Sequence, residues 1–471
     1  MLYRRKKKGF FYYLKALLYS AITGCALFCL YQQEGKKLEL FDADRILAQS
    51  VLQNKTFSAE VKEIEEAGIK AYLMEEHSNP IISIDFEFQN AGYAHDKKGK
   101  FGLAKIASSL IMDGAGKFDD KAFLDLMEEN GIKISFNASK DSFSGSLITP
   151  KANFKTAQSL LKQIIFSPRL PLKHLAITKA QMLKSLQLQK ENPSSVLSLA
   201  FNEQIYGSHP YGRNPLGRKE DIESISKDDI TEYLERTFAK QNLIIGIAGD
   251  ISEDESKSFI KNIFGSMPEE SAQELLEELE YASQGKEHHI EREMPQVIAV
   301  FSAKGTHRES PDFYPLYLAN YILGESGLTS RLNKVLREDN GLTYGIFTTL
   351  SNNASSSFIS GNFSASAENY EKAKELFLSQ WQKMAKEGVS SYELEKAKKS
   401  LIDSFNLRFA DIEGLSAMLL AMQKYNLGLD FLQKRNDYIK NLTIKEVNEA
   451  AKKYYSATLD FVTIGPKRKE K

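Results

Sequence analysis

The sequence has little cysteine and no net charge. Its 471 residues include two cysteines, Cys25 and Cys29, so the 440 residues after Tyr31 cannot form a disulfide bond or a thiolate zinc site. Lysine and arginine together number 62, as do aspartate and glutamate, and this balance argues against a nucleic-acid-binding protein. A composition of 42% hydrophobic and 26% charged residues excludes a disordered chain, a collagen and a multispan membrane protein.

Positive charge is concentrated at the N-terminus. Residues 1–31 contain six bases and no acid, which leaves 56 bases against 62 acids in the rest of the chain. Five consecutive bases precede an apolar run at residues 16–31, a pattern typical of an export signal or a single membrane anchor. Sixteen residues are few for a membrane span, whereas counting from Phe10, with the Lys15 side chain reaching the interface, gives 22. A cleaved signal peptide and a retained anchor both remain open.

Residues 22–25, Ile-Thr-Gly-Cys, also resemble a bacterial lipoprotein cleavage box, although the apolar run continues after Cys25. A basic end stays on the cytoplasmic side of the membrane, so the body of the protein lies on the other side. We therefore expect export across the bacterial inner membrane into the periplasm, with residues 1–31 as the contact with the membrane.

Landmarks of the sequence recur in the same order, 213 to 217 residues apart. They are prolines before strand-like runs, glycines after those runs, the starts of long helical patterns, helix N-caps and the glycines that end the last strands. The pairs are Pro80 and Pro295, Gly92 and Gly305, Lys179 and Lys396, Ser226 and Thr443, and Gly249 and Gly465. The chain is therefore predicted to be a duplicated domain.

Each half has the predicted order of strands, a helix, more strands, two long helices, a capped helix and a final strand. This order indicates an α+β fold of two homologous α/β sandwich domains, each an antiparallel-rich sheet covered by helices. We expect an N-terminal domain at residues 57–267 and a C-terminal domain at 294–466. The acidic and polar stretch at 268–293 has no strand pattern and is interpreted as the linker between them.

The helix predicted at residues 102–112 has two distinct faces. Leucine, isoleucine and alanine recur on one face at helical spacing, which makes it a core face. The other face carries Lys105, Ser108 and Ser109 at positions i, i+3 and i+4. This polar face is the one on which chemistry is sought.

Here the chain resembles the pitrilysin/insulinase family of zinc peptidases, the inverzincins, and in particular their bacterial two-subunit branch. The resemblance runs from about Phe57 to Gly465, and it implies a helix that reads Gly-x-x-His-x-x-Glu-His in active members. Aligning Gly102 puts Lys105 and Ser109 at the histidine positions and Ser108 at the position of the general base. Ser185 occupies the position of the third zinc ligand, a glutamate in the family.

One lysine and three serines do not suit zinc, which takes neutral imidazole and carboxylate ligands. None of the seven histidines pairs with another at i, i+4 spacing. We expect His288 and His289 to be solvated in the linker and His209 to be structural. The chain is predicted to bind no metal and to be inactive alone, with zinc as the cofactor of a partner subunit.

The second half retains a different motif. Residues 326–332 contain Ser-Arg-Leu after a glycine turn, and residues 336–345 read Leu-Arg-Glu-Asp-Asn-Gly-Leu-Thr-Tyr-Gly. Both closely resemble the second-half signature of the family, in which an arginine and a tyrosine reach the substrate bound at zinc. Register assigns these roles to Arg337 and Tyr344, a guanidinium and a hydroxyl that would stabilise a tetrahedral oxyanion.

Structural alternatives exist for these residues. Arg337 could pair with Glu338 or Asp339, and Tyr344 could be an ordinary strand aromatic. Arg331 is a second candidate that is better explained as structural.

Substrate peptides of the family add as a strand to a sheet edge. Asn90, Ala91 and Gly92, which follow the first long strand, are weaker candidates for that contact.

The leading hypothesis is therefore a non-catalytic subunit of an exported heterodimeric zinc peptidase. Its partners would be a zinc-bearing homologous subunit, a peptide substrate and the membrane, and no nucleic acid. The alternative is a catalytically inert peptide-binding or assembly scaffold of the same fold. A third hypothesis, a lone enzyme with unusual ligands, is decided by metal analysis of the isolated chain.

Overall fold

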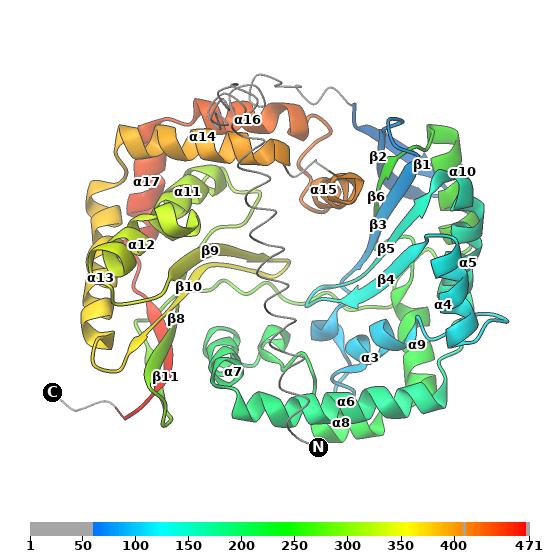
Figure 1. The fold of residues 1–471 in the computed structure, drawn as a ribbon, viewed down its shortest axis with the longest axis horizontal. Helices are drawn as coiled ribbons and strands as arrows, with labels where there is room; N and C mark the ends of the chain where they lie inside the picture. The colour runs from blue at the N-terminus through cyan, green and yellow to red at the C-terminus, as the bar shows by residue number, and fades with distance from the viewer. Residues whose placement is uncertain (1–59, 408–410, 468–471) are drawn as a thin grey trace, which may run out of the picture. The chain divides into compact units, whose positions relative to one another are not determined.

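The computed structural model describes residues 60–407 and 411–467, which belong to one compact unit. The predicted signal or anchor at residues 1–31 lies outside the described residues. Within the described ranges, no helix combines the length and the apolar character that crossing a membrane requires. The described residues form two β-sheets with helices packed against them (Figure 1), which confirms the predicted α+β class.

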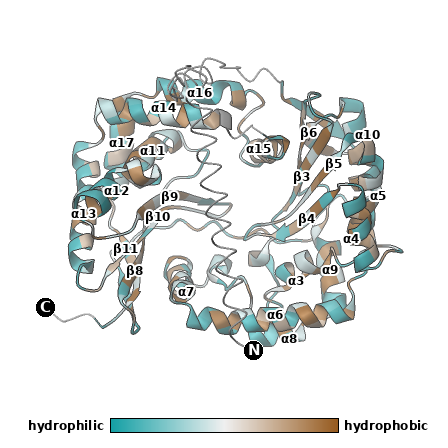
Figure 2. Cartoon of the chain, viewed as in Figure 1, coloured by the Kyte–Doolittle hydropathy of each residue, from teal (hydrophilic) through white to brown (hydrophobic). Residues whose placement is uncertain are grey.

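The first sheet has six strands in the order β1-β2-β6-β3-β5-β4. All neighbouring pairs are antiparallel except β2 and β6, which run parallel. The strands are β1 (Lys62–Glu66), β2 (Ile69–Glu75), β3 (Ile81–Gln89), β4 (Lys133–Ala138), β5 (Ser142–Pro150) and β6 (Leu243–Gly249). Both faces of β3 are largely buried, because helices pack on the two sides of the sheet. Figure 2 shows the hydropathy of the residues along these strands.

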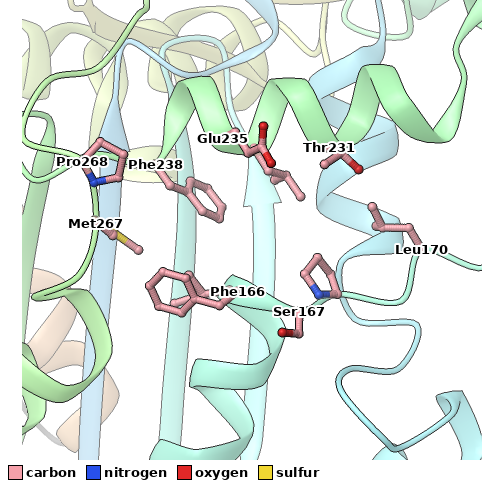
Figure 3. A pocket seen from close by; sticks show the side chains of 11 residues that line it. Phe166, Ser167, Leu170, Thr231, Glu235, Phe238, Met267 and Pro268 are labelled. Carbon is pink, nitrogen blue, oxygen red and sulfur yellow. The ribbon is translucent and has the colours of Figure 1, made fainter.

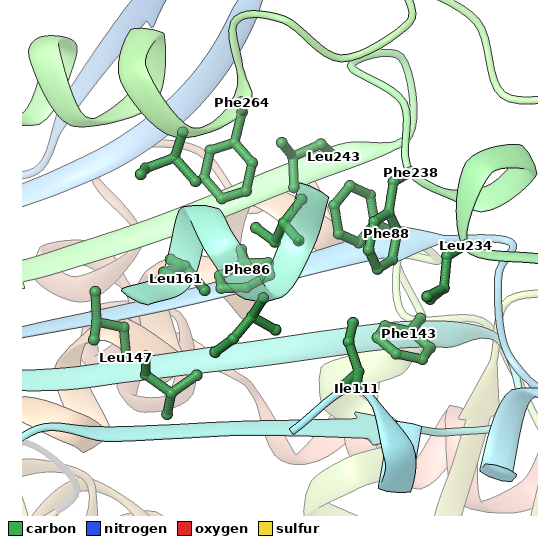
Figure 4. Close-up of a cluster of buried hydrophobic side chains, with 14 of the residues drawn as sticks. Phe86, Phe88, Ile111, Phe143, Leu147, Leu161, Leu234, Phe238, Leu243 and Phe264 are labelled. Carbon is green, nitrogen blue, oxygen red and sulfur yellow. The ribbon is translucent and has the colours of Figure 1, made fainter. Parts of the chain in front are cut away.

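Helices cover one face of this sheet and enclose the first core. Phe86 and Phe88 of β3 pack with Phe143 of β5, with Phe238 just after one helix and with Phe264 at the end of another (Figure 4). The covering helices are α3 (Leu103–Leu110), α4 (Asp120–Glu129), α5 (Phe154–Phe166), α9 (Lys227–Thr237) and α10 (Glu253–Phe264). Aromatic side chains make this core because each buries a large apolar area.

The first half also contains α6 (Leu172–Glu191), which packs against α3, and α8 (Lys219–Ser224), which packs against α6. The short turns η1 (Tyr93–His95), η2 (Lys151–Asn153) and η3 (Pro210–Gly212) connect these elements. The predicted N-cap Ser226 forms a capping box with Asp229 at the start of α9.

The second sheet has the order β7-β11-β8-β10-β9. Its strands are β7 (Glu287–Glu291), β8 (Gln296–Lys304), β9 (Ile346–Asn353), β10 (Ser356–Ser366) and β11 (Asp460–Gly465). The strand β7 lies inside the stretch that was expected to be a linker without strands. Its sequence is polar and its side chains are largely exposed. Backbone pairing with β11, rather than burial of an apolar face, holds it in the sheet. That expectation was wrong for residues 287–291.

Helices of the second half pack around the second core. Phe301 of β8 contacts Phe377 and Trp381, with ring centroids 4.4 and 5.9 Å apart. The longer helices are α13 (Tyr370–Glu387), α14 (Ser391–Leu407), α16 (Phe431–Asn441) and α17 (Ile444–Tyr455). The shorter elements are α11 (Phe313–Asn320), η4 (Tyr321–Glu325), η5 (Gly327–Thr329), α12 (Arg331–Asn333) and η6 (Lys334–Asp339).

Each half lends one helix to the sheet of the other half. Helix α7 (Pro193–Tyr206) packs on β8 and β11, where it joins Phe358, Val462 and Ile464 in a cluster separate from the second core. Helix α15 (Ile412–Lys424) packs on β6, β3 and β2, on the face opposite α4 and α5 (Figure 1). The exchange is reciprocal, so each sheet is buried on both faces.

The approach of α15 is especially close. A Cβ atom at Gly246 of β6 would lie 2.3 Å from the carbonyl oxygen of Ser416, so only glycine fits there. The Ser416 hydroxyl bonds to Ser83 at 2.8 Å and to Asp85 at 2.6 Å. These contacts fix α15 through polar groups, whereas α7 is fixed mainly by apolar ones.

Candidate functional site

Helix α3 is the element that would carry the zinc motif, and its start is well fixed. Asp96 is buried, and its carboxylate accepts hydrogen bonds from the amides of Gly102 and Ala104 at 2.8 and 3.0 Å. Burial raises the pKa of Asp96 to about 7, against the lowering effect of these amides. Gly102 has φ 99°, and a Cβ atom there would lie 2.8 Å from the carbonyl oxygen of Leu216. The local structure that aligns the motif is therefore retained.

The side chains on this helix do not offer metal ligands. The Lys105 ammonium lies 3.5 Å from Asn137 Oδ1 and 5.9 Å from the centre of the Tyr93 ring, and burial lowers the pKa of Lys105. The hydroxyls of Ser108 and Ser109 donate back to the carbonyl of Lys105 at 3.0 and 3.1 Å. Both hydroxyls thus serve the helix backbone.

Ser185, the position of the third ligand, is exposed on α6, the helix that packs against α3. In the described ranges no group of three or more histidine, cysteine, aspartate or glutamate residues could hold a metal ion. An ammonium and three hydroxyls do not fit zinc, because the ion needs lone pairs from imidazole or carboxylate.

Two histidines elsewhere in the chain, His209 and His289, have structural partners. His209 Nε2 lies 3.0 Å from the carbonyl of Glu277, and its Nδ1 accepts from the amide of Tyr211. His289 lies on β7, where its ring contacts the hydroxyl of Thr463 at 2.9 Å and the carbonyl of Pro466 at 3.1 Å. His209 is structural as expected, whereas His289 is more engaged than a solvated linker residue.

In the second half, Arg331 is an anchoring residue. Its guanidinium makes two hydrogen bonds to the Glu393 carboxylate, at 2.5 and 2.6 Å, and one to the carbonyl of Gly388 at 2.9 Å. Burial opposes ionisation of Glu393, but the bonds from Arg331 and Ser390 outweigh it and lower the pKa of Glu393 to about 2. The structural interpretation of Arg331 is confirmed.

Arg337 and Tyr344 are exposed on either side of a tight turn. Arg337 lies in the π-helical turn η6, and Tyr344 precedes the edge strand β9 with 81% of its surface exposed. Within the described part of the chain, neither side chain has a hydrogen-bond or ion-pair partner, so Arg337 does not pair with Glu338 or Asp339. Both functional groups remain available for an external ligand.

A buried asparagine positions this segment, and sequence analysis missed it. The Asn333 amide donates to the carbonyls of Gly327 and Ile346 at 2.9 and 2.7 Å, and its oxygen accepts from the amide of Ile346 at 3.2 Å. It therefore ties the glycine turn, the start of η6 and the start of β9 together. The available signal was a polar residue on the apolar side of the short helix.

The three residues after β3 do not lie at a sheet edge. Ala91 is fully buried, and its amide donates to the carbonyl of Asp141. A Cβ atom at Gly92 would lie 2.3 Å from the carbonyl of Lys140. Because β3 is central and β4 is the terminal strand, the expectation that Asn90, Ala91 and Gly92 flank an edge was wrong.

An apolar cavity of about 360 Å³ lies between the end of α5, helix α9 and Pro268 (Figure 3). Phe166, Leu170, Phe238 and Met267 line it, and Glu235 is its one carboxylate. None of the motif positions described above contributes to its wall.

Comparisons with known proteins agree with this geometry. Residues 224–401 match the family model described as "Peptidase M16 inactive domain". A Helicobacter pylori protein described as "Non-peptidase homolog YmxG" is 26% identical over 416 residues, which cover 87% of this chain and 95% of that protein. A Bacillus subtilis protein described as "Uncharacterized zinc protease YmxG" is 22% identical over 80% of this chain and 91% of that protein.

Solved structures share the fold. The crystal structure of a peptidase M16 inactive domain from Pseudomonas fluorescens has a TM-score of 0.81 and 26% identity, covering 87% of this chain and 99% of that one. The Escherichia coli periplasmic protease PqqL has a TM-score of 0.76 with 17% identity, covering 87% of this chain and 46% of that one, which shows the fold alone.

Fold and motif positions together define a protein built like a zinc peptidase but without the zinc ligands. Over most of its length the chain is therefore similar to peptidase M16 homologues, and its positions for the zinc motif carry no zinc ligands. This finding confirms the resemblance to pitrilysin and insulinase inferred from the sequence.

Proposed function

We propose that this protein is the non-catalytic subunit of an exported heterodimeric zinc peptidase. The observation that carries the proposal is the exposed, unpaired Arg337 and Tyr344 on a segment fixed by buried Asn333, in a chain whose α3 has lost its ligands. A buried anchor with exposed functional groups is typical of a site that acts on another molecule. The partner would be a homologous subunit that carries the zinc helix.

The chemistry of the pair follows from its groups. Zinc in the partner would supply the activated water. The Tyr344 hydroxyl and the Arg337 guanidinium would donate to the oxyanion that forms on the peptide carbonyl and would hold the peptide backbone in place. The peptide would then be cleaved between the two subunits.

Location and domain limits belong to the same proposal. The basic and apolar residues 1–31 support export to the periplasm with the segment as signal or anchor, and the similar fold of PqqL, a periplasmic protease, is consistent with that compartment. The two domains would span residues 57–267 and 294–466.

The test is reconstitution. The full chain, purified alone, should contain no stoichiometric zinc and should cleave no peptide. Mixed with a homologous chain that carries the intact His-x-x-Glu-His helix, it should form a one-to-one complex that cleaves peptides and loses activity with a chelator. A complex that forms but leaves the activity of the zinc-bearing chain unchanged would overturn the proposal.

The alternative is an inert peptide-binding or assembly scaffold. A relative described as a non-peptidase homologue favours it as a second candidate. Co-purification from membranes separates the two, because a scaffold would recover partners without any chain that bears the zinc helix.

A further inference from the structure

A polar cavity of about 520 Å³ lies between the first half and the segment that leaves it. Basic side chains dominate its wall, which includes His95, Lys97, Lys98, Arg213, Arg236 and Glu274. None of these residues belongs to the degenerate zinc positions or to the Arg337 and Tyr344 pair.

Arg213 is held in the wall by neutral groups. Its Nη1 donates to the carbonyls of Ala94 and Asp96 at 2.9 and 3.1 Å, and its guanidinium lies 4.5 Å from the centre of the Phe101 ring. In the described ranges no carboxylate forms an ion pair with it. Its position is therefore fixed while its charge is not neutralised by a direct partner.

Arg236 contributes a second guanidinium to the wall of the cavity. It is half-buried at the end of α9, and its Nε is buried without a hydrogen-bond partner in the described part of the chain. Its carbonyl accepts bonds from Ser271 and Ala272, which ties the exit segment to α9. A buried N–H without a partner is costly and is usually satisfied by a ligand or water.

His95 lies close enough to both guanidiniums to sense their charges. Burial is the main cause that lowers the pKa of His95, and Arg213 and Arg236 lower it further. Its Nδ1 lies 3.1 Å from the carbonyl of Glu274 on the exit segment. The imidazole therefore links the basic wall to the segment that covers it.

Among the described residues the nearby acids form no ion pair with either arginine, although Asp96 is close enough to Arg213, and Glu232 to Arg236, for their charges to interact. Both oxygens of Asp96 accept from amides at the start of α3, and Glu232 pairs with Lys97 at 2.5 Å. Lys98 and the two guanidiniums line the cavity together with the exposed carboxylate of Glu274. Like charges held together in a partly buried site are unfavourable, and an oxyanion that accepts from arginine in a bidentate manner offsets that cost.

We propose that this cavity binds a small oxyanion with two or more negative charges, of the phosphate or polycarboxylate class, between Arg213, Arg236 and Lys98. The bound anion would accept hydrogen bonds from the Arg236 guanidinium and hold the exit segment against the first half. The inference is independent of the peptidase proposal, since it uses different residues and a different ligand.

Calorimetric titration of the full chain with inorganic phosphate, and separately with citrate, tests the site. The ionic strength is held constant, and titration with chloride is the control. We expect one saturable site that is weakened by about tenfold in Lys98→Gln and in Arg236→Gln, the loss of one charge-assisted bond. Glu274→Gln should tighten binding several-fold, because it removes the opposing carboxylate. Lys219→Gln, at an exposed position of α8, is the matched control and should bind as the parent does.

Whichever anion binds more tightly identifies the favoured group, phosphate or carboxylate. Circular dichroism melting of each variant checks that it folds. Because Lys98 is exposed, the Lys98→Gln variant still tests the site if the Arg236→Gln variant does not fold. The proposal is overturned if neither anion gives a saturable signal up to about 10 mM, or if Lys98→Gln and Glu274→Gln both bind like the control.

Discussion

The two halves of this protein differ most in the helices that precede their edge hairpins. In the first half, α3 and α4 are regular α-helices. In the second half, α11 and α12 continue into the π-helical turns η4 and η6. π-Turns are rare and are frequently found at functional sites, so we expect the irregular half to be the one that has kept a function.

The side chains at the motif positions also differ between the two halves in their exposure. In the first half, Ser108 is buried and donates to its own helix, and Lys105 is drawn partly into the protein. In the second half, Arg337 and Tyr344 extend from the surface. The serine hydroxyls of α3 are thus engaged by their own helix, whereas the functional groups of Arg337 and Tyr344 are exposed.

Restoring the lost ligands is the strongest test of this comparison. A chain with Lys105→His, Ser108→Glu, Ser109→His and Ser185→Glu should bind one zinc ion at least about a thousandfold more tightly than the parent chain. The reason is that the start of α3 and its packing on α6 are retained. Zinc content after dialysis, measured by atomic emission, reports the result.

The matched control keeps Ser185 and carries the other three changes, and it should bind zinc more weakly because one ligand is missing. If the fourfold variant holds no more zinc than the parent, α3 and α6 no longer have the geometry of a metal site.

The second prediction concerns the retained pair. In the reconstituted peptidase, Arg337→Ala and Tyr344→Phe should each lower kcat/KM by about a hundredfold, since each removes a donor to the oxyanion. Lys334→Ala, an exposed change earlier in η6, should leave the rate nearly unchanged. Equal rates for all three variants would show that the irregular helix has no catalytic role.

The third prediction compares the packing of the first sheet against α15 with the packing of the second sheet against α7. Gly246→Val should lower the free energy of unfolding by about 3 kcal/mol, because a side chain there collides with α15. At Val462, 216 residues later and buried beneath α7, valine already fills the space. There Val462→Ala should cost about 2 kcal/mol by leaving a cavity. Urea unfolding measures both, and a stable Gly246→Val would mean that α15 can move away from its sheet.

The smallest expected effect is a pH dependence at Arg331 and Glu393. The pKa of Glu393 is lowered to about 2 in the folded state, from an ordinary value of 4.5. The pair therefore stabilises the fold above about pH 4.5, and this contribution is lost as the pH falls towards 2. Glu393→Gln should cost about 2 kcal/mol at pH 7 and should show a shallower loss of stability between pH 4.5 and 2. Parallel acid-unfolding curves for variant and parent would contradict this assignment.

The sequence was sufficient for features that repeat or that follow helical periodicity. The duplication was visible because prolines, glycines and caps such as Ser226 and Thr443 mark element ends directly. The face of α3 was predictable because three polar residues share one side of a short helix. The positions of Arg337 and Tyr344 followed from the motif, although their catalytic role stays a prediction.

Other features depend on contacts that sequence patterns do not encode. The strand β7 has no apolar alternation, since pairing with β11 holds it in place. Strand order is not written in the sequence, so the residues after β3 were assigned to the wrong part of the sheet. The π-turns were also not foreseen, because a short run such as residues 334–339 cannot distinguish a wide helical turn from a regular one.

The reciprocal lending of α7 and α15 also bears on how this protein responds to cleavage. A protease that nicks the backbone between Pro268 and Lys286 would release neither piece, since each fragment remains clamped beneath a helix of its neighbour. Expressed separately, either fragment would leave a sheet face uncovered. The chain should therefore survive a break in its middle better than the loss of one end.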